Sequence, residues 1–287
     1  RGEMAVKWLK ALRHPKSRLP GKAFQLDPWQ ENVIRRIYGP RNPDGTRVVR
    51  RVVLLLPRGN RKTSLCAAIT LLHLMGPERE PGGLTISAAS AHEQALELFN
   101  EAALIIRNDP RLEKHLSIRD YVSRITCEKA QTRYIAIASD GKVQHGKTPN
   151  VVIADELHAW EGRAGLKQWE ALDSALVKVP GTLMLVASTS GRGQENLAWK
   201  TVEYAIKVQK GEIDDPATLP VIFMAGGSGL SSPRSMILDL LAEGFARPIT
   251  LIYGQRNREE LYYHDEFLAL AIRHPNFHYV PALSHEP

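Results

Sequence analysis

The fold is decided by the stretch Val52-Val53-Leu54-Leu55-Leu56-Pro57-Arg58-Gly59-Asn60-Arg61-Lys62-Thr63, together with Val151-Val152-Ile153-Ala154-Asp155-Glu156. Each begins with an apolar run that is typical of a buried strand. The first run leads into a short loop ending in Lys-Thr, which is how backbone N–H groups and a lysine hold a phosphate chain while a hydroxyl binds its Mg²⁺. The second leads into two carboxylates, one suited to Mg²⁺ and one to orienting an attacking water. Together they indicate hydrolysis of a nucleoside triphosphate.

The loop departs from the strict pattern G-x-x-x-x-G-K-[ST], which has glycine where this chain has Leu56 and Arg61. Taken alone, residues 58–62 fit a basic turn between a buried strand and a helix equally well. The two acids also have a plainer interpretation, because acidic residues favour the first turn of a helix. Both features occur in order, about 90 residues apart and each after a strand-like run, and this coincidence favours the nucleotide site.

Around these motifs the chain resembles the ATPase domain of the large terminase subunit of tailed bacteriophages, the motor that packages DNA. The resemblance covers about residues 10–222, and its blocks lie in family order. They are Phe24-Gln25-Leu26-Asp27-Pro28-Trp29-Gln30, the loop Pro57–Thr63, Ala88-Ala89-Ser90 with Glu93-Gln94-Ala95, Ala138-Ser139-Asp140-Gly141 with His145-Gly146, and Leu185-Val186-Ala187-Ser188-Thr189-Ser190-Gly191. Arg61 stands where most relatives have glycine, so the backbone there cannot adopt positive φ freely.

The resemblance implies a role for each site residue. ATP would be bound by Gln30, which reads the adenine, and by Pro57, Arg58, Gly59, Asn60, Arg61, Lys62, Thr63 and Ser64. Mg²⁺ would be held by Thr63 and Asp155. The catalytic residues would be Glu156 on the nucleophilic water, Arg58 on the γ-phosphate and Lys62 on the β/γ-phosphates, while Ser188, Thr189 and Ser190 would couple hydrolysis to movement.

The order of the motifs predicts an α/β fold. A strand, loop and helix, then a strand ending in acids, then a strand ending in Ser and Thr, fit one parallel sheet with ligands at the carboxyl ends of its strands. The resemblance specifies the ASCE-type sheet of P-loop NTPases, with flanking helices.

The chain changes character near Pro220. The pattern predicts a strand over residues 220–225, a helix from Pro233 to Ala242, a strand at 249–254, a helix from Glu259 to Ile272 and a strand at 278–281. This β-α-β-α-β alternation indicates a partial Rossmann-like unit. Gly226, Gly227, Ser228 and Gly229 would let the backbone approach a pyrophosphate. The plainer interpretation of these glycines is a tight strand-to-helix turn.

About residues 220–287 resemble the NAD(P)-binding domain of ferredoxin-NAD reductase-type flavoproteins, notably the reductase components of phenol and toluene hydroxylases. The matching blocks are Gly226-Gly227-Ser228-Gly229-Leu230-Ser231-Ser232-Pro233, Tyr253-Gly254-Gln255-Arg256 and His274-Pro275-Asn276-Phe277. We therefore expect a terminase-like ATPase domain over residues 1–217 and a partial reductase-like unit over 218–287, with the join between Leu219 and Ala225. Since the terminase nuclease and the flavin-binding barrel have no counterpart here, we expect ATP and Mg²⁺ as cofactors, NAD(P)H bound at most weakly, no flavin, and neither DNA cleavage nor electron transfer.

Charge is uneven along the 287 residues. The formal net charge is +7, and residues 1–51 hold 13 Lys/Arg against 4 Asp/Glu, whereas residues 218–287 hold 5 against 7. A basic N-terminal arm suits double-stranded DNA, although a single basic stretch is more commonly a solvated surface. The resemblance adds the small terminase subunit, the portal protein and a homo-oligomeric ring as partners.

The remaining features are less specific. Cys66 and Cys127 have no metal-ligand spacing and fit reduced core residues. His92, His145 and His158 are scattered, which favours surface or loop positions over a zinc site, and Trp160, Trp169 and Trp199 fit packing positions. No apolar run suits a membrane span and no export signal is seen, so we expect the host cell cytoplasm.

The sequence thus predicts ATP hydrolysis by a viral DNA-packaging motor without its nuclease domain. Two alternatives stay open. One is an NAD(P)H-binding fragment of an aromatic hydroxylase reductase. The other is a catalytically impaired DNA-binding or assembly protein, for which Arg61 in the phosphate loop is the main argument.

Overall fold

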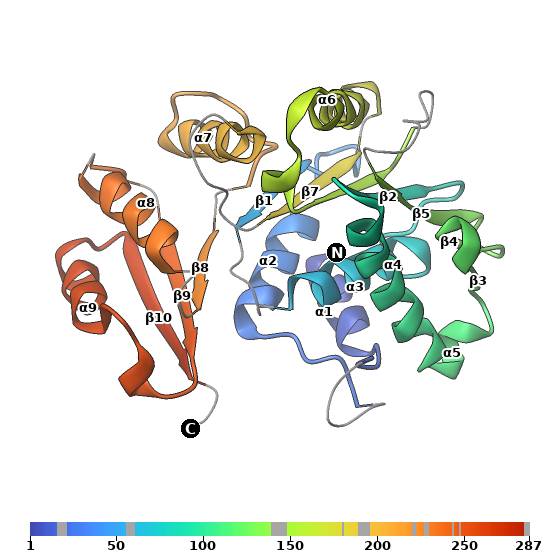
Figure 1. Cartoon of the computed structure of the whole chain (residues 1–287), viewed down its shortest axis with the longest axis horizontal. Helices are drawn as coiled ribbons and strands as arrows, with labels where there is room; N and C mark the ends of the chain where they lie inside the picture. Colours follow the sequence, from blue (N-terminus) through green and yellow to red (C-terminus); the bar gives the residue numbers. More distant parts are fainter. Residues whose placement is uncertain are drawn as a thin grey trace.

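The structure, a computed structural model, describes residues 1–15, 22–55, 61–138, 148–179, 181–188, 196–219, 222–226, 230–242, 244–246 and 248–283. One large sheet runs through this part of the chain (Figure 1). Its ten strands follow the order β10-β9-β8-β1-β7-β6-β2-β5-β4-β3. They are β1 (Arg51–Leu55), β2 (Leu84–Ala89), β3 (Ser117–Arg119), β4 (Arg124–Cys127), β5 (Thr132–Ala138), β6 (Val151–Asp155), β7 (Leu183–Ser188), β8 (Ile222–Gly226), β9 (Ile249–Gln255) and β10 (Phe277–Leu283).

Helices connect these strands. The α-helices are α1 (Gly2–Lys10), α2 (Pro28–Tyr38), α3 (Lys62–Leu74), α4 (His92–Arg107), α5 (Pro110–Glu113), α6 (Gly162–Lys178), α7 (Leu197–Lys210), α8 (Ser231–Ala242) and α9 (His264–Arg273). Single 3₁₀ turns are η1 (Asp120–Val122), η2 (Leu157–Ala159) and η4 (Arg258–Glu260). Neighbouring strands are parallel from β10 as far as β5 and antiparallel from β5 to β3. The predicted α/β fold with a mainly parallel sheet is confirmed.

The central strands are buried on both faces, which is why they are continuous apolar runs. On β1, Val52 and Leu54 pack with α1 to α4, whereas Val53 and Leu55 pack on the opposite face with α7 and α8. A third cluster joins α6 to β2, β6 and β7. In Figure 1, α6 and α7 accordingly lie on one side of the central strands and α1 to α5 on the other.

The C-terminal unit continues the same sheet. β8 pairs with β1, with Leu55 opposite Phe223, and β9 and β10 extend the sheet in parallel. α8 and α9 share a core with Val53 and Leu55 of β1. The helix after β1 and the helix after β8 therefore lie on opposite faces of two adjacent strands. Such a reversal is the position at which open α/β sheets form a crevice at their carboxyl edge.

The starts of both helices in the C-terminal unit differ from the prediction, whereas the strand ends differ by a few residues at most. α8 begins at Ser231, two residues before Pro233. The helix predicted from Glu259 is instead η4 followed by α9, which starts at His264. Tyr263 has φ 59°, a left-handed conformation that no α-helix can contain, so the two helical pieces are separate.

Within residues 1–15 and 22–51, which the structure describes, the basic N-terminal segment packs against the core. α1 packs on α2 and α3 and buries Ala5, Val6 and Leu9. Many cations of residues 1–51 are engaged within the chain: Arg1 with Pro77 O, Lys10 with Glu31, Arg35 with Glu3 and Glu31, Arg41 and Arg47 with Glu78, Arg50 with Val179 O, and Arg51 with Asp173. Several cations of this segment therefore have partners inside the chain, although Glu78 and Asp173 are the acids that residues outside the segment contribute to these contacts.

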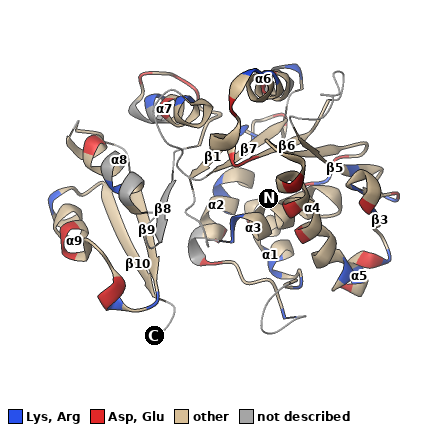
Figure 2. Cartoon of the chain, viewed as in Figure 1, with Lys and Arg blue, Asp and Glu red and all other residues tan. Residues whose placement is uncertain are grey.

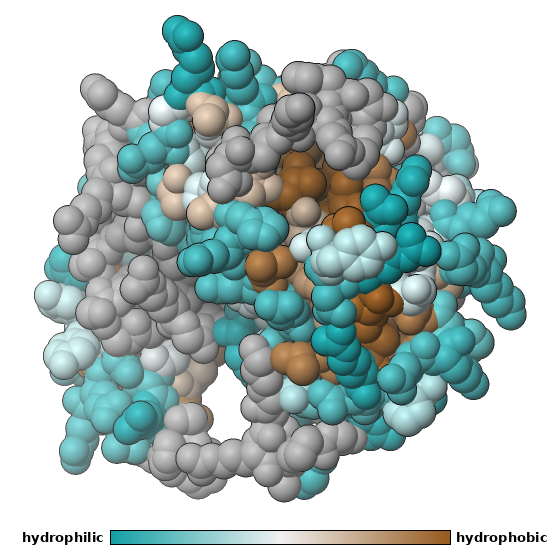
Figure 3. All heavy atoms as spheres, turned by 45° about the vertical axis from the view of Figure 1, so that its right-hand side comes forward, coloured by the Kyte–Doolittle hydropathy of each residue, from teal (hydrophilic) through white to brown (hydrophobic). Residues whose placement is uncertain are grey.

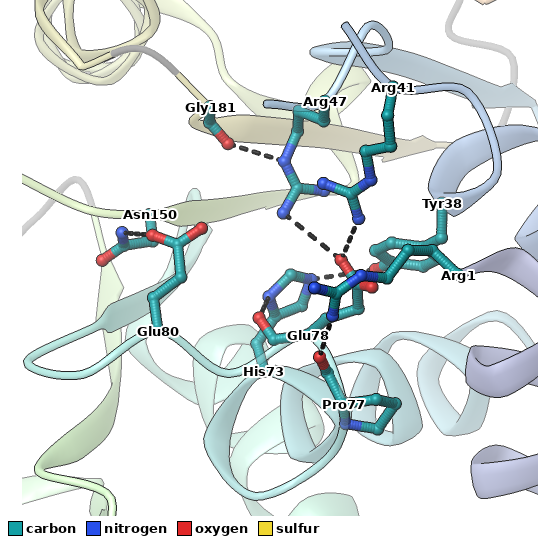
Figure 4. A network of polar contacts seen from close by, with 10 residues as sticks. All are labelled: Arg1, Tyr38, Arg41, Arg47, His73, Pro77, Glu78, Glu80, Asn150 and Gly181. Atoms are coloured by element: carbon teal, nitrogen blue, oxygen red, sulfur yellow. Dashed lines mark hydrogen bonds and ion pairs between the residues drawn. The ribbon is translucent and has the colours of Figure 1, made fainter. Parts of the chain in front are cut away.

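A buried polar network lies at the amino-terminal edge of the sheet (Figure 4). Glu78 is 2.6 Å from Arg41 and 3.8 Å from Arg47. The ring of His73 contacts the Tyr38 hydroxyl at 2.9 Å and the backbone oxygen of Glu78 at 3.1 Å. Complete burial, reinforced by the nearby Arg47 charge, lowers the pKa of His73 well below its usual value. His73 is therefore neutral, and it ties the end of α3 to α2.

The surface is mixed in character. Figure 3 brings the right-hand side of Figure 1 forward and shows apolar residues gathered in the middle of that face, with hydrophilic residues around them. Exposed large apolar side chains include Tyr121, Val122 and Leu166. Among the described helices, none combines the length and the apolar character that crossing a bilayer demands.

Candidate active site

Four predicted site residues meet at the carboxyl ends of β1, β6 and β7. Lys62 opens α3 after β1, Asp155 ends β6, Glu156 follows it, and Ser188 ends β7. These strands are neighbours in the order β1-β7-β6, with Asp155 opposite Ala187. The parallel register is what brings residues so distant in sequence to one edge.

Lys62 is held between the two acids. Its Nζ lies 3.0 Å from Asp155 Oδ1 and also pairs with Glu156 Oε1. Burial alone would lower the pKa of Lys62, but the two carboxylates outweigh it and raise that pKa. Burial likewise raises the pKa of Asp155, and the Lys62 charge opposes this only in part. The side chains are 11%, 6% and 19% exposed for Lys62, Asp155 and Glu156, so this is a shielded charge cluster with one cation for two anions.

Glu156 is fixed by backbone and side-chain contacts to β7. It has φ 49°, and its N–H donates to the Ala187 carbonyl at 2.8 Å. A left-handed conformation at a non-glycine residue costs about 1 kcal/mol or more and is typical of functional sites. Its Oε2 is 3.0 Å from Nδ1 of His158, and the same nitrogen is 3.2 Å from Ser188 Oγ.

His158 is the site residue that the sequence analysis missed. It was grouped with scattered histidines, yet it lies on η2 between Glu156 and Ser188. Its position two residues after Glu156, directly following the strand and the acid pair, is a signal that could have identified it.

The start of α2 lies beside the start of α3. Arg61 pairs with Asp27 at 2.9 Å, and the Asp27 N–H donates to Oε1 of Gln30 at 2.9 Å. Gln30 is 2% exposed, so in this arrangement its amide oxygen caps α2. Arg61 has φ 51° and ψ 31°, the left-handed region that glycine adopts freely and that the sequence analysis expected to be difficult here. The adenine-reading role of Gln30 stays a prediction.

Oxygen ligands for a metal are available next to Lys62. Thr63 is half-buried in the first turn of α3, and Asp155 supplies a buried carboxylate. Hydroxyl and carboxylate oxygens are suited to Mg²⁺. Ser64 points away from this group, since its hydroxyl donates to Glu101 of α4.

Several predicted residues lie outside the described residues. These are Pro57, Arg58, Gly59 and Asn60 of the phosphate loop, Thr189 and Ser190 of the coupling motif, and Gly227, Ser228 and Gly229 of the glycine cluster. Gly226 is described and ends β8, opposite Gly254, on the strand next to β1. It is thus not part of the Lys62 cluster.

A separate hollow of about 280 Å³ lies near the other end of α3. It is lined by Met75, Arg79, His115, Cys127, Lys129 and Ala130. None of the predicted site residues lines this hollow. We therefore place the candidate active site at the cluster of Lys62, Asp155 and Glu156.

Two family descriptions match the chain. "Terminase large subunit, ATPase domain" matches residues 28–207, and "Oxidoreductase NAD-binding domain" matches residues 223–287. The two ranges do not overlap, and the interval between them contains the end of α7 and the start of β8. The predicted resemblance of one segment to the terminase ATPase domain and of the following segment to an NAD-binding reductase domain is confirmed.

Known proteins match each part separately. The terminase large subunit of Enterobacteria phage HK97 is 30% identical over 193 residues, covering 67% of this chain and 37% of that protein. The reductase component DmpP of phenol 2-monooxygenase from Pseudomonas sp. strain CF600 is 67% identical over 64 residues, covering 22% of this chain and 18% of that protein. The chain thus spans well under two thirds of either relative. The crystal structure of the HK97 large terminase superimposes with a TM-score of 0.68 and 25% identity, over 96% of this chain and 52% of that one.

Proposed function

Since the chain belongs to the family of terminase large subunits, we propose that it binds ATP with Mg²⁺ and hydrolyses it as part of a phage DNA-packaging motor. The observation that carries this proposal is the shielded cluster of Lys62, Asp155 and Glu156 at the carboxyl edge of the sheet. Enzymes that hydrolyse a phosphoanhydride use a cation for the phosphate oxygens, a ligand for the metal and a group that orients the water, and a lysine with two carboxylates can supply all three.

The residues of the cluster fit a nucleotide with its metal. Lys62 is paired with two acids, so a phosphate chain with Mg²⁺ would replace both partnerships: the phosphates would bind Lys62, and the metal would bind Asp155. Lys62 would then bind the phosphates, and Thr63 and Asp155 would hold the metal. When bound, Mg²⁺ would neutralise charge on the phosphate oxygens.

Glu156 would then orient and deprotonate the attacking water. Its Oε1 contacts Lys62 and its Oε2 contacts His158, so the two oxygens of this carboxylate face different groups. Arg58 at the γ-phosphate, Gln30 at the adenine, and Ser188 with Thr189 and Ser190 in coupling complete the proposal on the basis of the family resemblance.

Double-stranded DNA is the proposed polymer, and the arginines of the edge strands offer a surface for it. Arg119 and Arg124 are directly opposite each other on β3 and β4, and Arg133 of β5 lies diagonally from Arg124 on the same face. Within the described residues, none of the three forms an ion pair, and Nε of Arg124 is buried without a hydrogen-bond partner. Like charges in register are unfavourable alone and would be relieved by phosphates. Figure 2 shows Lys and Arg together with Asp and Glu along this edge. The small terminase subunit, the portal protein and a homo-oligomeric ring are proposed as further partners.

A second candidate function is NAD(P)H binding by the C-terminal unit. It is favoured by the match of residues 223–287 and by Gly226 at the carboxyl end of β8. A dinucleotide pyrophosphate would lie at the start of α8, where N–H groups are available. We expect weak binding and no reduction of an electron acceptor.

Titration of the purified chain with labelled ATP and with NADH, combined with a phosphate-release assay, separates the three functions. ATP binding with turnover supports the motor. Binding without turnover points to the impaired assembly protein, and NADH binding alone points to the reductase fragment.

A further inference from the structure

His158 connects the acid of the candidate active site to the end of β7. The backbone N–H of His158 donates to Ser188 Oγ at 3.3 Å, and its Nδ1 lies 3.2 Å from the same oxygen and 3.0 Å from Oε2 of Glu156. A carboxylate only accepts hydrogen bonds, so Nδ1 is the protonated ring nitrogen in this contact. The backbone N–H of His158 thus ties the residue to Ser188 of β7, and the single proton on Nδ1 is donated to Glu156, the nearer of its two contacts.

Both constraints on Glu156 come from consecutive residues of β7. The backbone N–H of Glu156 donates to the carbonyl of Ala187, and its carboxylate reaches Ser188 through His158. The side chains of His158 and Glu156 are 26% and 19% exposed, so water competes only partly for this contact. A carboxylate on a flexible side chain otherwise has several rotamers, and a donor on one oxygen selects among them.

From this geometry we infer that His158 is a positioning residue for Glu156: it holds Oε2 so that Oε1 faces the reacting phosphate, and it makes that orientation depend on the position of Ser188. The inference rests on the proposed ATPase function. A shift of the end of β7 would move His158 through Ser188 and would turn the carboxylate of Glu156. The contact thereby gives the coupling segment that begins at Ser188 a direct mechanical route to the acid.

Three variants of the full chain test this role. His158→Ala removes the donor, His158→Asn places an amide N–H near the position of Nδ1, and His278→Ala removes an exposed histidine of β10 as the control. We expect His158→Ala to lower kcat for ATP about 10- to 100-fold, because a misplacement of about 1 Å costs this much. KM for ATP should stay within about 3-fold, because the phosphate-loop contacts are untouched. His158→Asn should recover most of kcat, and His278→Ala should behave as the parent.

A purely structural role gives a different pattern. Unchanged kcat in His158→Ala, or a loss that His158→Asn does not repair and that follows a fall in Tm, would overturn the inference. A double variant with Ser188→Ala should be no worse than the poorer single variant, since both act on one contact.

The proposed function and this inference fail separately. A parent chain without ATP turnover overturns the proposed function, and a crystal structure of His158→Ala then decides the positioning role. A Glu156 carboxylate that keeps its orientation in that variant would refute it, whereas a rotated carboxylate would support it.

Discussion

The two parts of the sheet use the same strand geometry with different chemistry at the carboxyl edge. In the N-terminal part, β1, β6 and β7 bring together Lys62, Asp155 and Glu156, whose charges are shielded and paired. In the C-terminal part, at the same edge of β9, the Tyr253 hydroxyl accepts from Gln255 and from the Tyr262 N–H, and Glu260 contacts only a backbone N–H, that of Arg256, through its carboxylate in the described hydrogen bonds. Parallel strands offer a place for a site, and only convergent titratable groups equip it for hydrolysis.

The two parts of the sheet also differ in how their faces are covered. Central strands such as β6 and β7 are buried on both faces. β9 and β10 are covered by α8 and α9 on one face, while His278 and Val280 of β10 are exposed on the other. The open edge of β10 is shielded from pairing with another strand by Pro281. Because the Ile249 N–H donates to the Asn276 carbonyl, Asn276 and every second residue after it face β9, whereas Pro281 faces the open edge. Proline has no N–H, so it offers no donor to an added strand.

The largest expected effect tests whether the charged edge is catalytic. Glu156→Gln should lower ATP turnover about 10²- to 10⁴-fold, because an amide cannot accept the proton of the water. ATP binding should persist, since Lys62, Thr63 and Asp155, which we propose to hold the phosphates and the metal, are unchanged. Phosphate release and equilibrium binding of labelled ATP measure the two quantities.

Glu161→Gln is the matched control for this variant, because Glu161 is exposed five residues further along the chain. It should behave as the parent. Turnover of Glu156→Gln within a few-fold of the parent would remove Glu156 from the catalytic role and would erase the chemical difference between the two edges.

DNA binding should also distinguish the two parts. Replacing Arg119, Arg124 and Arg133 together by Gln should lower the slope of log K against log salt for duplex DNA by about 3, because each phosphate contact contributes about 0.9. The equal charge change at Arg256, Arg258 and Arg273 of the C-terminal part should leave the slope unchanged. Fluorescence anisotropy at several salt concentrations measures this, and identical slopes for both triple variants would exclude the β3–β5 face.

Deletion of the basic N-terminal residues would be a poor test of DNA binding. Removing residues 1–22 would remove the buried face of α1, including Ala5 and Leu9, along with the charges. Loss of DNA binding in such a variant would follow from unfolding as readily as from lost phosphate contacts.

The pH dependence of stability should come from the N-terminal part. The folded pKa of His73 lies below its unfolded value of 6.5, so the unfolded chain binds the proton first as the pH falls. Stability is therefore complete above about pH 6.5 and is lost below it, by at most about 1.4 kcal/mol per pH unit for one proton.

His73→Gln should flatten this slope in denaturant unfolding between pH 6.5 and 5. Tyr38→Phe removes the hydroxyl partner of His73 but keeps the histidine buried, so it should lower stability while retaining the slope. An unchanged slope in His73→Gln would show that other groups control acid unfolding.

The smallest expected effects are changes in stability when Gln168 and Gln255 are replaced. Gln168 on α6 is 0% exposed, and neither atom of its amide has a hydrogen-bond partner in the described structure. Gln168→Met should stabilise the chain by about 1 kcal/mol, since an unsatisfied buried amide is removed. Gln255→Met in the C-terminal part breaks a 3.0 Å contact with Tyr253 and should destabilise by about 1 kcal/mol. Two-state unfolding curves measure both, and a destabilised Gln168→Met variant would mean that this amide has a polar partner in solution.

Much of the fold and part of the site could be predicted from the sequence. The apolar runs at β1, β6 and β7, the lysine after the first and the acids after the second fixed the sheet edge at which Lys62, Asp155 and Glu156 meet. The alternation after residue 220 predicted β8 to β10 and α8, and it misplaced the start of α9 because nothing in the local pattern marks the left-handed Tyr263. These features are local, and local patterns of apolar residues encode strands and helices directly.

Only the tertiary structure decided which residues far apart in sequence contact one another. The sequence shows how many cations the N-terminal segment has, but the fold determines their partners: Arg41 and Arg47 share Glu78, and Arg51 pairs with Asp173. The motif order placed Glu156 and Ser188 on different strands, and the β6–β7 register then brought His158 between them. Sequence patterns record which groups a segment carries, whereas the strand order and register determine which groups from other segments they face.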